Sequence, residues 1–367
     1  MKIAFIKRNF SYHGGAEKYL STLIEAFKKK EWEIHIFANK WITHEEVVFH
    51  KVPILPLGSF LKAYSFNHNL KINLKEFDCV ISFERTTNQH IYRAGEGCHR
   101  RWLELRSLIE SEIKKLSFKL NPLHRYYLRL EREIFEKTPL IIANSHMVKN
   151  EIINYYGIPS SKITVIYNGV DTEKFSPENR KKNSQLRHTL KLPDGRKIIL
   201  FVGSGFKRKG LFTLLKAMAI LNHKPYLLLI IGKGDIKRYM KISKNLGIED
   251  KVFFMGTRKD IESFYGIADL FVLPTIYDPF SNATIEAMAS GIPVITTTNN
   301  GVAELIEEGK EGFIIKNPFA HEELADKINT AMGNTKKMGE FARKKAEHFT
   351  IQRTVEEFTG CIKKFLS

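Results

Sequence analysis

The sequence contains little cysteine, no long apolar run and too few acidic residues to balance its basic ones. Its three cysteines, Cys79, Cys98 and Cys361, lie far apart and form no Cys-x-x-Cys pair. This spacing excludes a disulfide framework and a cysteine zinc site. No stretch approaches about 18 consecutive apolar residues, which excludes a transmembrane helix. The apolar run at residues 3–6 is too short for a signal peptide, so we expect a cytoplasmic protein.

The shortage of acidic groups is the strongest signal in the composition. The 367 residues include 58 Lys and Arg but only 40 Asp and Glu, which gives a net charge of +18. Such a balance favours an anionic partner, namely a nucleic acid, an acidic lipid or a phosphorylated substrate. A basic nucleic-acid-binding protein is therefore one functional alternative.

Strand-like apolar runs alternate with helical patterns along most of the chain. We expect strands at 2–6, 32–38, 79–83, 140–143, 198–202, 226–231, 252–255, 270–273 and 293–296, and helices at 17–30, 211–221, 235–246, 261–265 and 282–290. Such alternation predicts an α/β fold in which helices cover both faces of parallel sheets. The length suggests two domains, and the polar stretch 171–196 marks their boundary.

Both halves begin with a strand, a glycine-rich turn and a helix. The first turn contains Gly14 and Gly15, and the second, residues 203–210, reads GSGFKRKG. Glycines at such a turn let backbone N–H groups approach a phosphate at the helix N-terminus. Arg208 and Lys209 can also neutralise a diphosphate directly. The second turn is neither a Walker A loop nor a dinucleotide fingerprint. For Gly14 and Gly15 the alternative is the ordinary turn of a doubly wound domain.

Residues 274–306 read PTIYDPFSNATIEAMASGIPVITTTNNGVAELI. This stretch resembles the nucleotide-sugar signature of the family 4 retaining glycosyltransferases. The resemblance extends over the chain through motifs at 14–17, 142–145, 165–171, 207–210, 232–234 and 256–258. It implies the GT-B fold, in which two Rossmann-like doubly wound domains face a cleft. Residues 1–175 would form the acceptor-binding domain, with a crossover helix in 350–367, and residues 176–349 would form the nucleotide-sugar-binding domain.

The same stretch contains two carboxylates eight positions apart, Asp278 and Glu286. Carboxylates bind sugar and ribose hydroxyls, and backbone amides at a helix start can meet phosphate oxygens. The expected amide donors are those of Ser281, Asn282, Ala283 and Thr284. The resemblance implies that Asp278 contacts the donor hexose and that Glu286 holds the ribose. Asp278 stands where the family usually has Glu. The alternative for Glu286 is a carboxylate that merely supports the helix dipole.

The resemblance also assigns roles to three cations. Arg208 and Lys209 would bind the diphosphate and stabilise the leaving nucleotide, whereas Arg258 would lie near the base. The alternative for Arg258 is a surface arginine that caps the next helix. No Asp-x-Asp occurs in the chain, so we expect no metal and no cofactor besides the UDP-sugar donor. The resemblance implies a retaining reaction with front-face attack by the acceptor hydroxyl.

A second resemblance concerns the acceptor. Residues 91–99, IYRAGEGCH, resemble a phrase in transferases of the lipopolysaccharide core. Glu96 or His99 could orient the acceptor hydroxyl or act as general base, although a histidine beside such a turn is often structural. Arg93, Arg100 and Arg101 would suit phosphates on a lipid-linked sugar.

The segment 99–130 contains eight basic residues and only three acidic ones, interleaved with aromatic and aliphatic side chains. This pattern predicts binding to an anionic membrane surface. The alternative is a solvated helical hairpin.

Together these features favour transfer of a hexose, glucose in the leading version, from a UDP-sugar to a lipid-linked saccharide of the lipopolysaccharide core. Another envelope glycan or a soluble acceptor is the alternative, and an epimerase or a glucan synthase of similar fold is a further rival. We expect a peripheral enzyme on the cytoplasmic face of the inner membrane. A nucleic-acid partner is not expected, because it would not explain the two glycine-rich loops or the two carboxylates.

Overall fold

The computed structural model describes residues 1–9, 15–41, 47–183 and 185–367, with the side chains of 15–18 left aside. Within these ranges the chain forms two compact units. The N-terminal unit comprises residues 1–168 and 352–367, and the C-terminal unit comprises residues 169–351. The boundary expected at 175/176 thus falls inside the C-terminal unit. The reason is a contact with the returning chain: the N–H of Val170 donates to the carbonyl of Phe349 over 2.8 Å.

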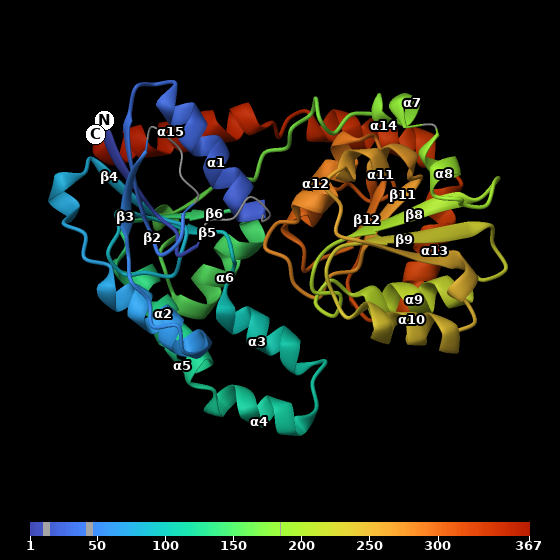
Figure 1. The fold of residues 1–367 in the computed structure, drawn as a ribbon, viewed down its shortest axis with the longest axis horizontal. Helices are drawn as coiled ribbons and strands as arrows, with labels where there is room; N and C mark the ends of the chain where they lie inside the picture. Colours follow the sequence, from blue (N-terminus) through green and yellow to red (C-terminus); the bar gives the residue numbers. More distant parts are fainter. Residues whose placement is uncertain (10–14, 42–46, 184) are drawn as a thin grey trace. The chain divides into compact units, whose positions relative to one another are not determined.

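The N-terminal unit is a parallel sheet covered by helices (Figure 1). Its strands are β1 (Lys2–Ile6), β2 (Glu33–Ala38), β3 (Val48–Lys51), β4 (Cys79–Ser82), β5 (Ile91–Ala94), β6 (Leu140–Ala143) and β7 (Ile163–Val165), and its helices are α1 (Gly15–Lys28), α2 (Gly58–Asn69), α3 (His99–Ser107), α4 (Glu112–Leu120), α5 (Pro122–Lys137), α6 (His146–Tyr156) and α15 (Ile351–Leu366). The described strands follow the order β3-β2-β1-β4-β5-β6-β7.

The C-terminal unit repeats this architecture. Its strands are β8 (Lys197–Val202), β9 (Tyr226–Ile231), β10 (Val252–Gly256), β11 (Leu270–Leu273), β12 (Val294–Thr297) and β13 (Gly312–Ile315), in the order β10-β9-β8-β11-β12-β13. Its helices are α7 (Asn179–Lys182), α8 (Leu186–Thr189), α9 (Leu211–Ile220), α10 (Ile236–Asn245), α11 (Ile261–Ile267), α12 (Asn282–Ala289), α13 (His321–Met332) and α14 (Thr335–Ala346). Figure 1 shows α9 and α10 on one side of this sheet and α11 and α12 on the other.

Continuous apolar runs explain the two sheets. Strand β9 reads YLLLII and β11 reads LFVL, and every residue in both strands is buried. Strands covered by helices on both faces need apolar side chains in both directions, so they lack the alternation of a half-exposed strand. The α/β fold with two doubly wound domains is therefore confirmed.

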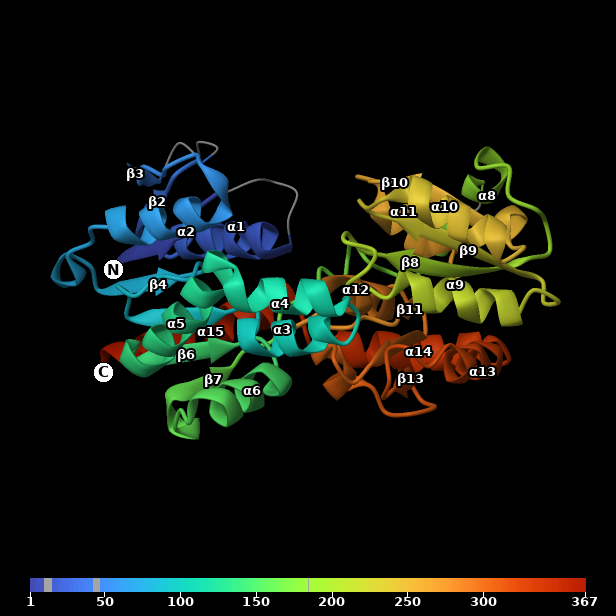
Figure 2. The ribbon, with the colours of Figure 1, turned by 90° about the horizontal axis from the view of Figure 1, so that it is seen from below.

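The C-terminal helix α15 belongs to the N-terminal unit, as the sequence predicted. Its Phe358 and Ile362 are fully buried in the core formed by β1 and α1, where Phe358 packs beside Phe83 and Tyr19. Seen from below in Figure 2, α15 (red) runs among the blue and green elements of this unit. The apolar stripe of α15 thus ties the end of the chain to the first sheet.

Candidate functional site

The strand order of the C-terminal unit diverges between β8 and β11. Connections from β8 proceed to β9 on one side of the sheet, whereas β11 leads to β12 on the other. In open α/β sheets, ligands bind at the carboxyl ends of strands where the order diverges in this way. The loop 203–210 follows β8 and the loop 274–281 follows β11, so both predicted donor loops lie at this point.

Glycine allows the two loops to approach each other closely. Gly210 has a φ of 77°, and a Cβ atom there would lie 1.9 Å from the carbonyl oxygen of Pro274. Backbone hydrogen bonds join the same loops, since the N–H of Ile276 donates to the carbonyl of Arg208 over 2.8 Å. A side chain at position 210 would push these loops apart, which explains the glycine.

The two loops are also joined by a buried ion pair. The ammonium of Lys209 donates to the carboxylate of Asp278, and both side chains are about one-tenth exposed. Burial lowers the pKa of Lys209 while the charge of Asp278 opposes that shift. Beside the pair, Arg208 Nη1 donates to the carbonyl of Tyr277 over 2.8 Å. Three residues predicted for the donor site are therefore brought together.

Asn300, which the sequence analysis did not identify, holds the Asp278 loop in place. Its buried Oδ1 accepts from the N–H of Ser281 at 3.1 Å, and its Nδ2 donates to Thr284 Oγ1 at 3.2 Å. The hydroxyl of Ser281 in turn caps α12 by accepting from the N–H of Thr284 at 3.3 Å. The amides of Ser281 and Thr284 are thus engaged within the fold. The phosphate-donor role predicted for the amides of Ser281, Asn282, Ala283 and Thr284 stays a prediction.

Glu286 lies one turn into α12 and is oriented by a tyrosine that the sequence analysis missed. The buried hydroxyl of Tyr265, on α11, lies 3.1 Å from Glu286 Oε2 and 3.0 Å from the carbonyl of Ala283. Burial and the charge of Glu286 raise the pKa of Tyr265 well above its usual value, so the phenol keeps its proton and donates. This contact fixes the carboxylate relative to the start of α12.

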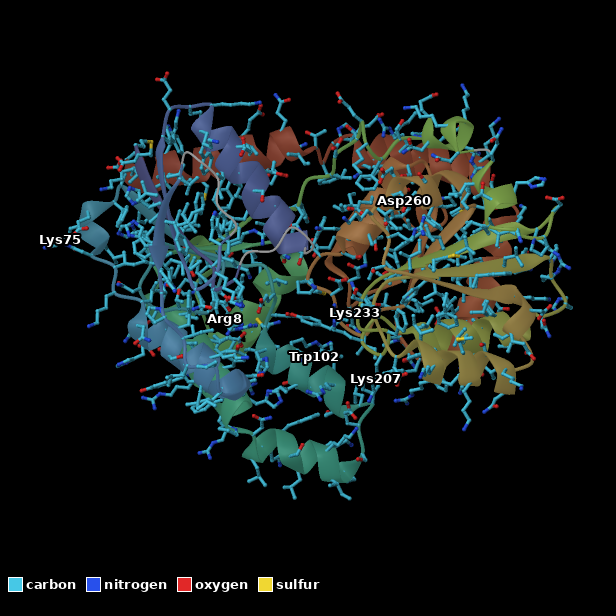
Figure 3. The ribbon with its side chains drawn as sticks, in the orientation of Figure 1. Arg8, Lys75, Trp102, Lys207, Lys233 and Asp260 are labelled. Carbon is cyan, nitrogen blue, oxygen red and sulfur yellow. The ribbon has the colours of Figure 1, made fainter. Side chains whose placement is uncertain are left out.

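Further cations surround the carboxyl ends of β9 and β10. Lys233 follows β9, and its carbonyl accepts from the N–H of Gly205 over 2.8 Å, which places it against the first loop. Figure 3 shows Lys233 and Lys207 at the same end of this sheet. Arg258 follows β10 and forms a two-point pair with Asp260, at 3.0 and 2.8 Å. Arg258 is thus paired with the residue that precedes α11, and its predicted role near the base stays a prediction.

In the N-terminal unit, Gly14 lies outside the described residues, and Gly15 begins α1. Glu96 lies in a cluster of charges at the carboxyl ends of β1, β4 and β5, where its carboxylate pairs with Arg85 and, at 4.0 Å, with Lys7. Desolvation acts to raise the pKa of Glu96, but the charges of Arg85 and Lys7 outweigh it and lower the pKa to about 2. Such a carboxylate is ionised and weakly basic, which suits orientation of a hydroxyl better than proton abstraction.

The side chain of His99 does not join the ion pairs of Glu96. His99 begins α3, its side chain is buried, and its Nε2 is 3.0 Å from Nδ1 of His124 on α5. Burial, with the nearby charge of Arg85, lowers the pKa of His99 to about 3. The structure thus places His99 in an interior contact between two helices, as the structural interpretation of this residue anticipated.

Glu131 organises this cluster, and the sequence analysis did not identify it. It is fully buried on α5 and accepts from the N–H of His99 at 2.7 and 2.9 Å. It also accepts from Arg85 Nε at 3.2 Å and from the hydroxyl of Tyr156 at 2.7 Å. Arg85 also binds the exposed carboxylate of Glu96. The buried carboxylate of Glu131 therefore fixes the arginine that holds Glu96 in place.

The three arginines suggested for acceptor phosphates have different environments. Arg93 is buried, donates to Asn168 and stacks on the ring of Tyr19 with 4.1 Å between the guanidinium and the ring centroid. Arg100 is exposed on α3, and Arg101, on the same helix, lies 3.8 Å from Glu104. Arg93 is therefore enclosed by the fold, whereas Arg100 is exposed and Arg101 is partly buried and paired.

The basic segment forms the helices α3, α4 and α5. On α4, three apolar side chains are exposed to an unusual degree: Ile113 by 84%, Leu116 by 59% and Leu120 by 69%. They lie three and four positions apart, so they share one face of the helix. Lys114, Lys115 and Lys119 accompany them.

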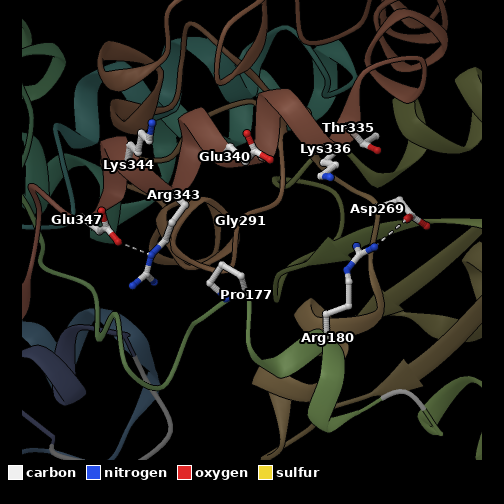
Figure 4. Close-up of a pocket in the computed structure, with 11 residues that line it drawn as sticks. Pro177, Arg180, Asp269, Gly291, Thr335, Lys336, Glu340, Arg343, Lys344 and Glu347 are labelled. Atoms are coloured by element: carbon white, nitrogen blue, oxygen red, sulfur yellow. Dashed lines mark hydrogen bonds and ion pairs between the residues drawn. The ribbon is translucent and has the colours of Figure 1, made fainter.

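A cavity of about 580 Å³ lies elsewhere in the C-terminal unit (Figure 4). Its lining includes Asp269, which directly precedes β11, and Gly291, which precedes β12. It therefore lies at the amino ends of these strands, away from the donor loops.

The described residues contain no cluster of three or more His, Cys, Asp or Glu suited to a metal ion. They also contain no helix long and apolar enough to cross a membrane.

Comparison with known families matches both units. Residues 13–174 match the model for Glycosyltransferase Family 4, and residues 182–348 match the model for Glycosyl transferases group 1. The chain belongs to the family 4 glycosyltransferases with the GT-B fold. The resemblance seen in the sequence is thus confirmed, and the donor loops fall within the region of the second match.

Individual proteins similar to this chain carry different names and match different shares of it. Spore coat protein SA of Bacillus subtilis is 31% identical over 244 residues, which cover 61% of this chain and 64% of that protein. The match thus spans less than two thirds of that relative. Lipopolysaccharide glucosyltransferase WaaG of Escherichia coli is 22% identical over 90% of both chains.

Solved structures show the same fold over nearly the full chain. The crystal structure of WaaG has a TM-score of 0.83 at 20% identity and covers 98% of this chain and 99% of its own. The structure of Anabaena HepE in complex with UDP and glucose has a TM-score of 0.76 at 20% identity and covers 99% of each chain.

Proposed function

We propose that this glycosyltransferase transfers glucose from UDP-glucose to a lipid-linked saccharide, with the lipopolysaccharide core as the leading acceptor. The observation that carries the proposal is the buried Lys209–Asp278 pair at the point where the C-terminal sheet diverges. A phosphate-binding cation and a sugar-binding carboxylate are joined there, beside the start of α12.

Each feature of this site has a role in binding the donor. Arg208 and Lys209 neutralise the diphosphate, and the start of α12 adds the favourable potential of a helix N-terminus. Glu286, held by Tyr265, binds the ribose hydroxyls. HepE, which shares the fold, was solved with UDP and glucose, and this supports a UDP-hexose as the donor.

The chemical step we propose is the retaining one that the family resemblance implies. The acceptor hydroxyl oxygen bonds to the anomeric carbon of the hexose, and the bond from that carbon to the phosphate oxygen breaks. The departing phosphate oxygen takes the hydroxyl proton, so attack and departure occur on the same face and the configuration is retained. Arg208 and Lys209 stabilise the negative charge that develops on the leaving UDP, and no metal ion is required for that role.

The acceptor is bound by the N-terminal unit. Glu96, Arg85 and Lys7 gather at the carboxyl ends of β1, β4 and β5, where the strand order of that sheet also diverges. The Glu96 carboxylate accepts a hydrogen bond from a sugar hydroxyl and orients it. The relation to WaaG, over 90% of both chains, supports a lipid-linked saccharide.

Helix α4 supports a membrane-bound acceptor. Its exposed Ile113, Leu116 and Leu120 enter the boundary between headgroups and acyl chains, while the neighbouring lysines bind anionic headgroups. The enzyme would then act as a peripheral protein on the cytoplasmic face of the inner membrane.

The second candidate is transfer to another envelope glycan. The 31% identity to spore coat protein SA, over 61% of this chain, supports an acceptor outside the lipopolysaccharide core.

A transfer assay tests the proposal. The protein is incubated with UDP-glucose and either lipopolysaccharide lacking its core glucose or a soluble sugar acceptor, and the anomeric configuration of the product is read by NMR. We expect glucose in the α configuration on the lipid-linked acceptor. Transfer only to the soluble acceptor would contradict the membrane proposal, and no transfer from any UDP-hexose would contradict the donor assignment.

A further inference from the structure

The C-terminal unit contains a strongly basic segment that the donor site uses only in part. Residues 203–248 include ten Lys and Arg but a single acidic residue, Asp235. The carboxylate of Asp235 is occupied in capping α10, where it accepts from the N–H of Arg238 at 3.1 Å. Arg208 and Lys209 belong to the donor loops, so most of the excess charge has another location.

Three of the remaining cations lie on the outer face of α10. Lys237, Lys241 and Lys244 are all exposed and are separated by four and three positions, so they form one stripe along the helix. Tyr239 and Ser243 are buried on the opposite side. No carboxylate of the described residues pairs with any of these three lysines. The stripe is therefore an uncompensated row of positive charge.

Exposed apolar side chains accompany the lysines. Met240 on α10 is 54% exposed, and on the neighbouring helix α9 Phe212 is 46% exposed and Ile220 is 45% exposed. Lys216 lies over the ring of Phe212 with its Nζ 5.0 Å from the centroid. Figure 1 shows α9 and α10 together on one side of the C-terminal sheet.

We propose that this surface, the α9–α10 face, binds anionic lipid headgroups as a membrane contact separate from α4. It deepens the proposed function, because it rests on a lipid-linked acceptor. Lysines bind headgroup phosphates, and Phe212 and Met240 enter the adjoining apolar layer. A nucleic acid would engage the lysines but offer no apolar layer for Met240 and Ile220, so the mixture of side chains favours a lipid surface.

The experiment compares two variants that lose the same charge. One is K237Q/K241Q/K244Q on α10, and the control is K336Q/K337Q/K344Q, which removes three exposed lysines from α14. Binding of the full chain to vesicles is measured by flotation, with phosphatidylcholine alone and with phosphatidylcholine mixed with phosphatidylglycerol. Each cation near an anionic surface strengthens binding by roughly fivefold.

We expect the α10 variant to bind the mixed vesicles at least about tenfold more weakly than the control variant does, with little difference on phosphatidylcholine alone. Equal binding by the two variants would overturn the inference. So would binding of the wild type to single-stranded RNA that the α10 variant loses, without a loss of vesicle binding.

Two further measurements separate this inference from the proposed function. Titration with UDP shows whether the α10 variant keeps its donor site, which we expect it to do. A variant of α4, I113S/L116S/L120S, shows whether the first membrane contact acts alone. If only the α4 variant loses vesicle binding, the inference fails and the proposed function stands. If the wild type binds mixed vesicles through α10 but binds no UDP, the inference stands and the proposed function fails.

Discussion

The ammonium of Lys209 and the carboxylate of Asp278 form a buried ion pair between the loops that follow β8 and β11. Lys209 is the expected phosphate ligand, and Asp278 is the carboxylate expected to contact the donor hexose. In the absence of donor, each therefore serves as the counter-ion of the other. A bound diphosphate would compete with Asp278 for the lysine and free the carboxylate for the sugar.

This pairing predicts an unusual effect of Asp278→Asn. The substitution leaves the Lys209 ammonium buried without a counter-ion, so we expect the free energy of unfolding to fall by about 3 kcal/mol. UDP replaces the lost negative charge, so it should bind the variant roughly tenfold more tightly, about 1.4 kcal/mol, while transfer falls. Calorimetric titration and urea unfolding measure both quantities. Asp260→Asn, which breaks an exposed pair with Arg258, is the control and should cost at most about 1 kcal/mol. Weaker UDP binding by D278N would refute the competition.

Tyr265 should act on the donor through Glu286. In Tyr265→Phe the carboxylate of Glu286 loses a hydrogen bond of 3.1 Å, so we expect the Kd of UDP to rise roughly fivefold, for about 1 kcal/mol. The control Tyr226→Phe removes a hydroxyl that contacts Asn329, and it should leave the Kd unchanged. An equal effect of both substitutions would show that Tyr265 has only a structural role.

His99 predicts how stability depends on pH. Its pKa is about 3 in the folded protein and about 6.5 when unfolded, so the unfolded chain binds the proton more strongly. Stability is therefore lost as the pH falls below about 6.5, by about 2 kcal/mol at about pH 5. The loss that Glu96 adds begins lower, as the pH falls from about 4.5 toward 2. Urea unfolding at about pH 7.5 and about pH 5 should show this loss in the wild type and in the control His223→Asn, and a loss smaller by about 2 kcal/mol in His99→Asn. Part of the loss remains in every variant, because burial also lowers the pKa of His50, His90 and His124. An equal loss in His99→Asn and in the wild type would contradict the assignment.

Glu131 should be critical for the stability of the N-terminal unit. Glu131→Ala leaves Arg85 and the N–H of His99 without their buried acceptor, so we expect a loss of about 3 kcal/mol in the free energy of unfolding. Glu133→Ala on the same helix breaks only an exposed pair with Lys137 and should change stability by about 0.5 kcal/mol at most. Similar losses for the two variants would mean that the buried network is not energetically coupled.

The sequence predicted the fold class and nine of the thirteen described strands, because buried parallel strands are continuous apolar runs. Strands such as β9 and β11 were recognisable for this reason, and helix α15 lies within the residues 350–367 where the family resemblance placed a crossover helix. Strand β5 was not recognised as a strand, because Arg93 interrupts it. That arginine is buried by stacking on Tyr19 and by donation to Asn168, contacts that depend on segments far apart in sequence.

The sequence predicted which residues form the donor site but not how they are arranged. Motifs identified Lys209, Asp278 and Glu286, whereas only the folded chain shows that the first two are paired. Glu131 was missed because a glutamate on a highly charged helix resembles a solvent-facing residue. A signal was available: Leu130, Ile134 and Phe135 recur at helical spacing around Glu131, and the structure buries this face together with His124.

The central claim is that Lys209 binds the diphosphate of a UDP-sugar at the carboxyl ends of β8 and β11. Its most direct test is a calorimetric titration of the full chain with UDP, comparing the wild type, Lys209→Ala and the control Lys259→Ala, an exposed lysine beside Arg258. We predict saturable binding by the wild type and by the control, and a loss of at least roughly 30-fold in Lys209→Ala, in line with about 2 kcal/mol or more for a charge-assisted contact. Unchanged UDP binding by Lys209→Ala, or no binding by the folded wild type, would contradict this assignment of the donor site.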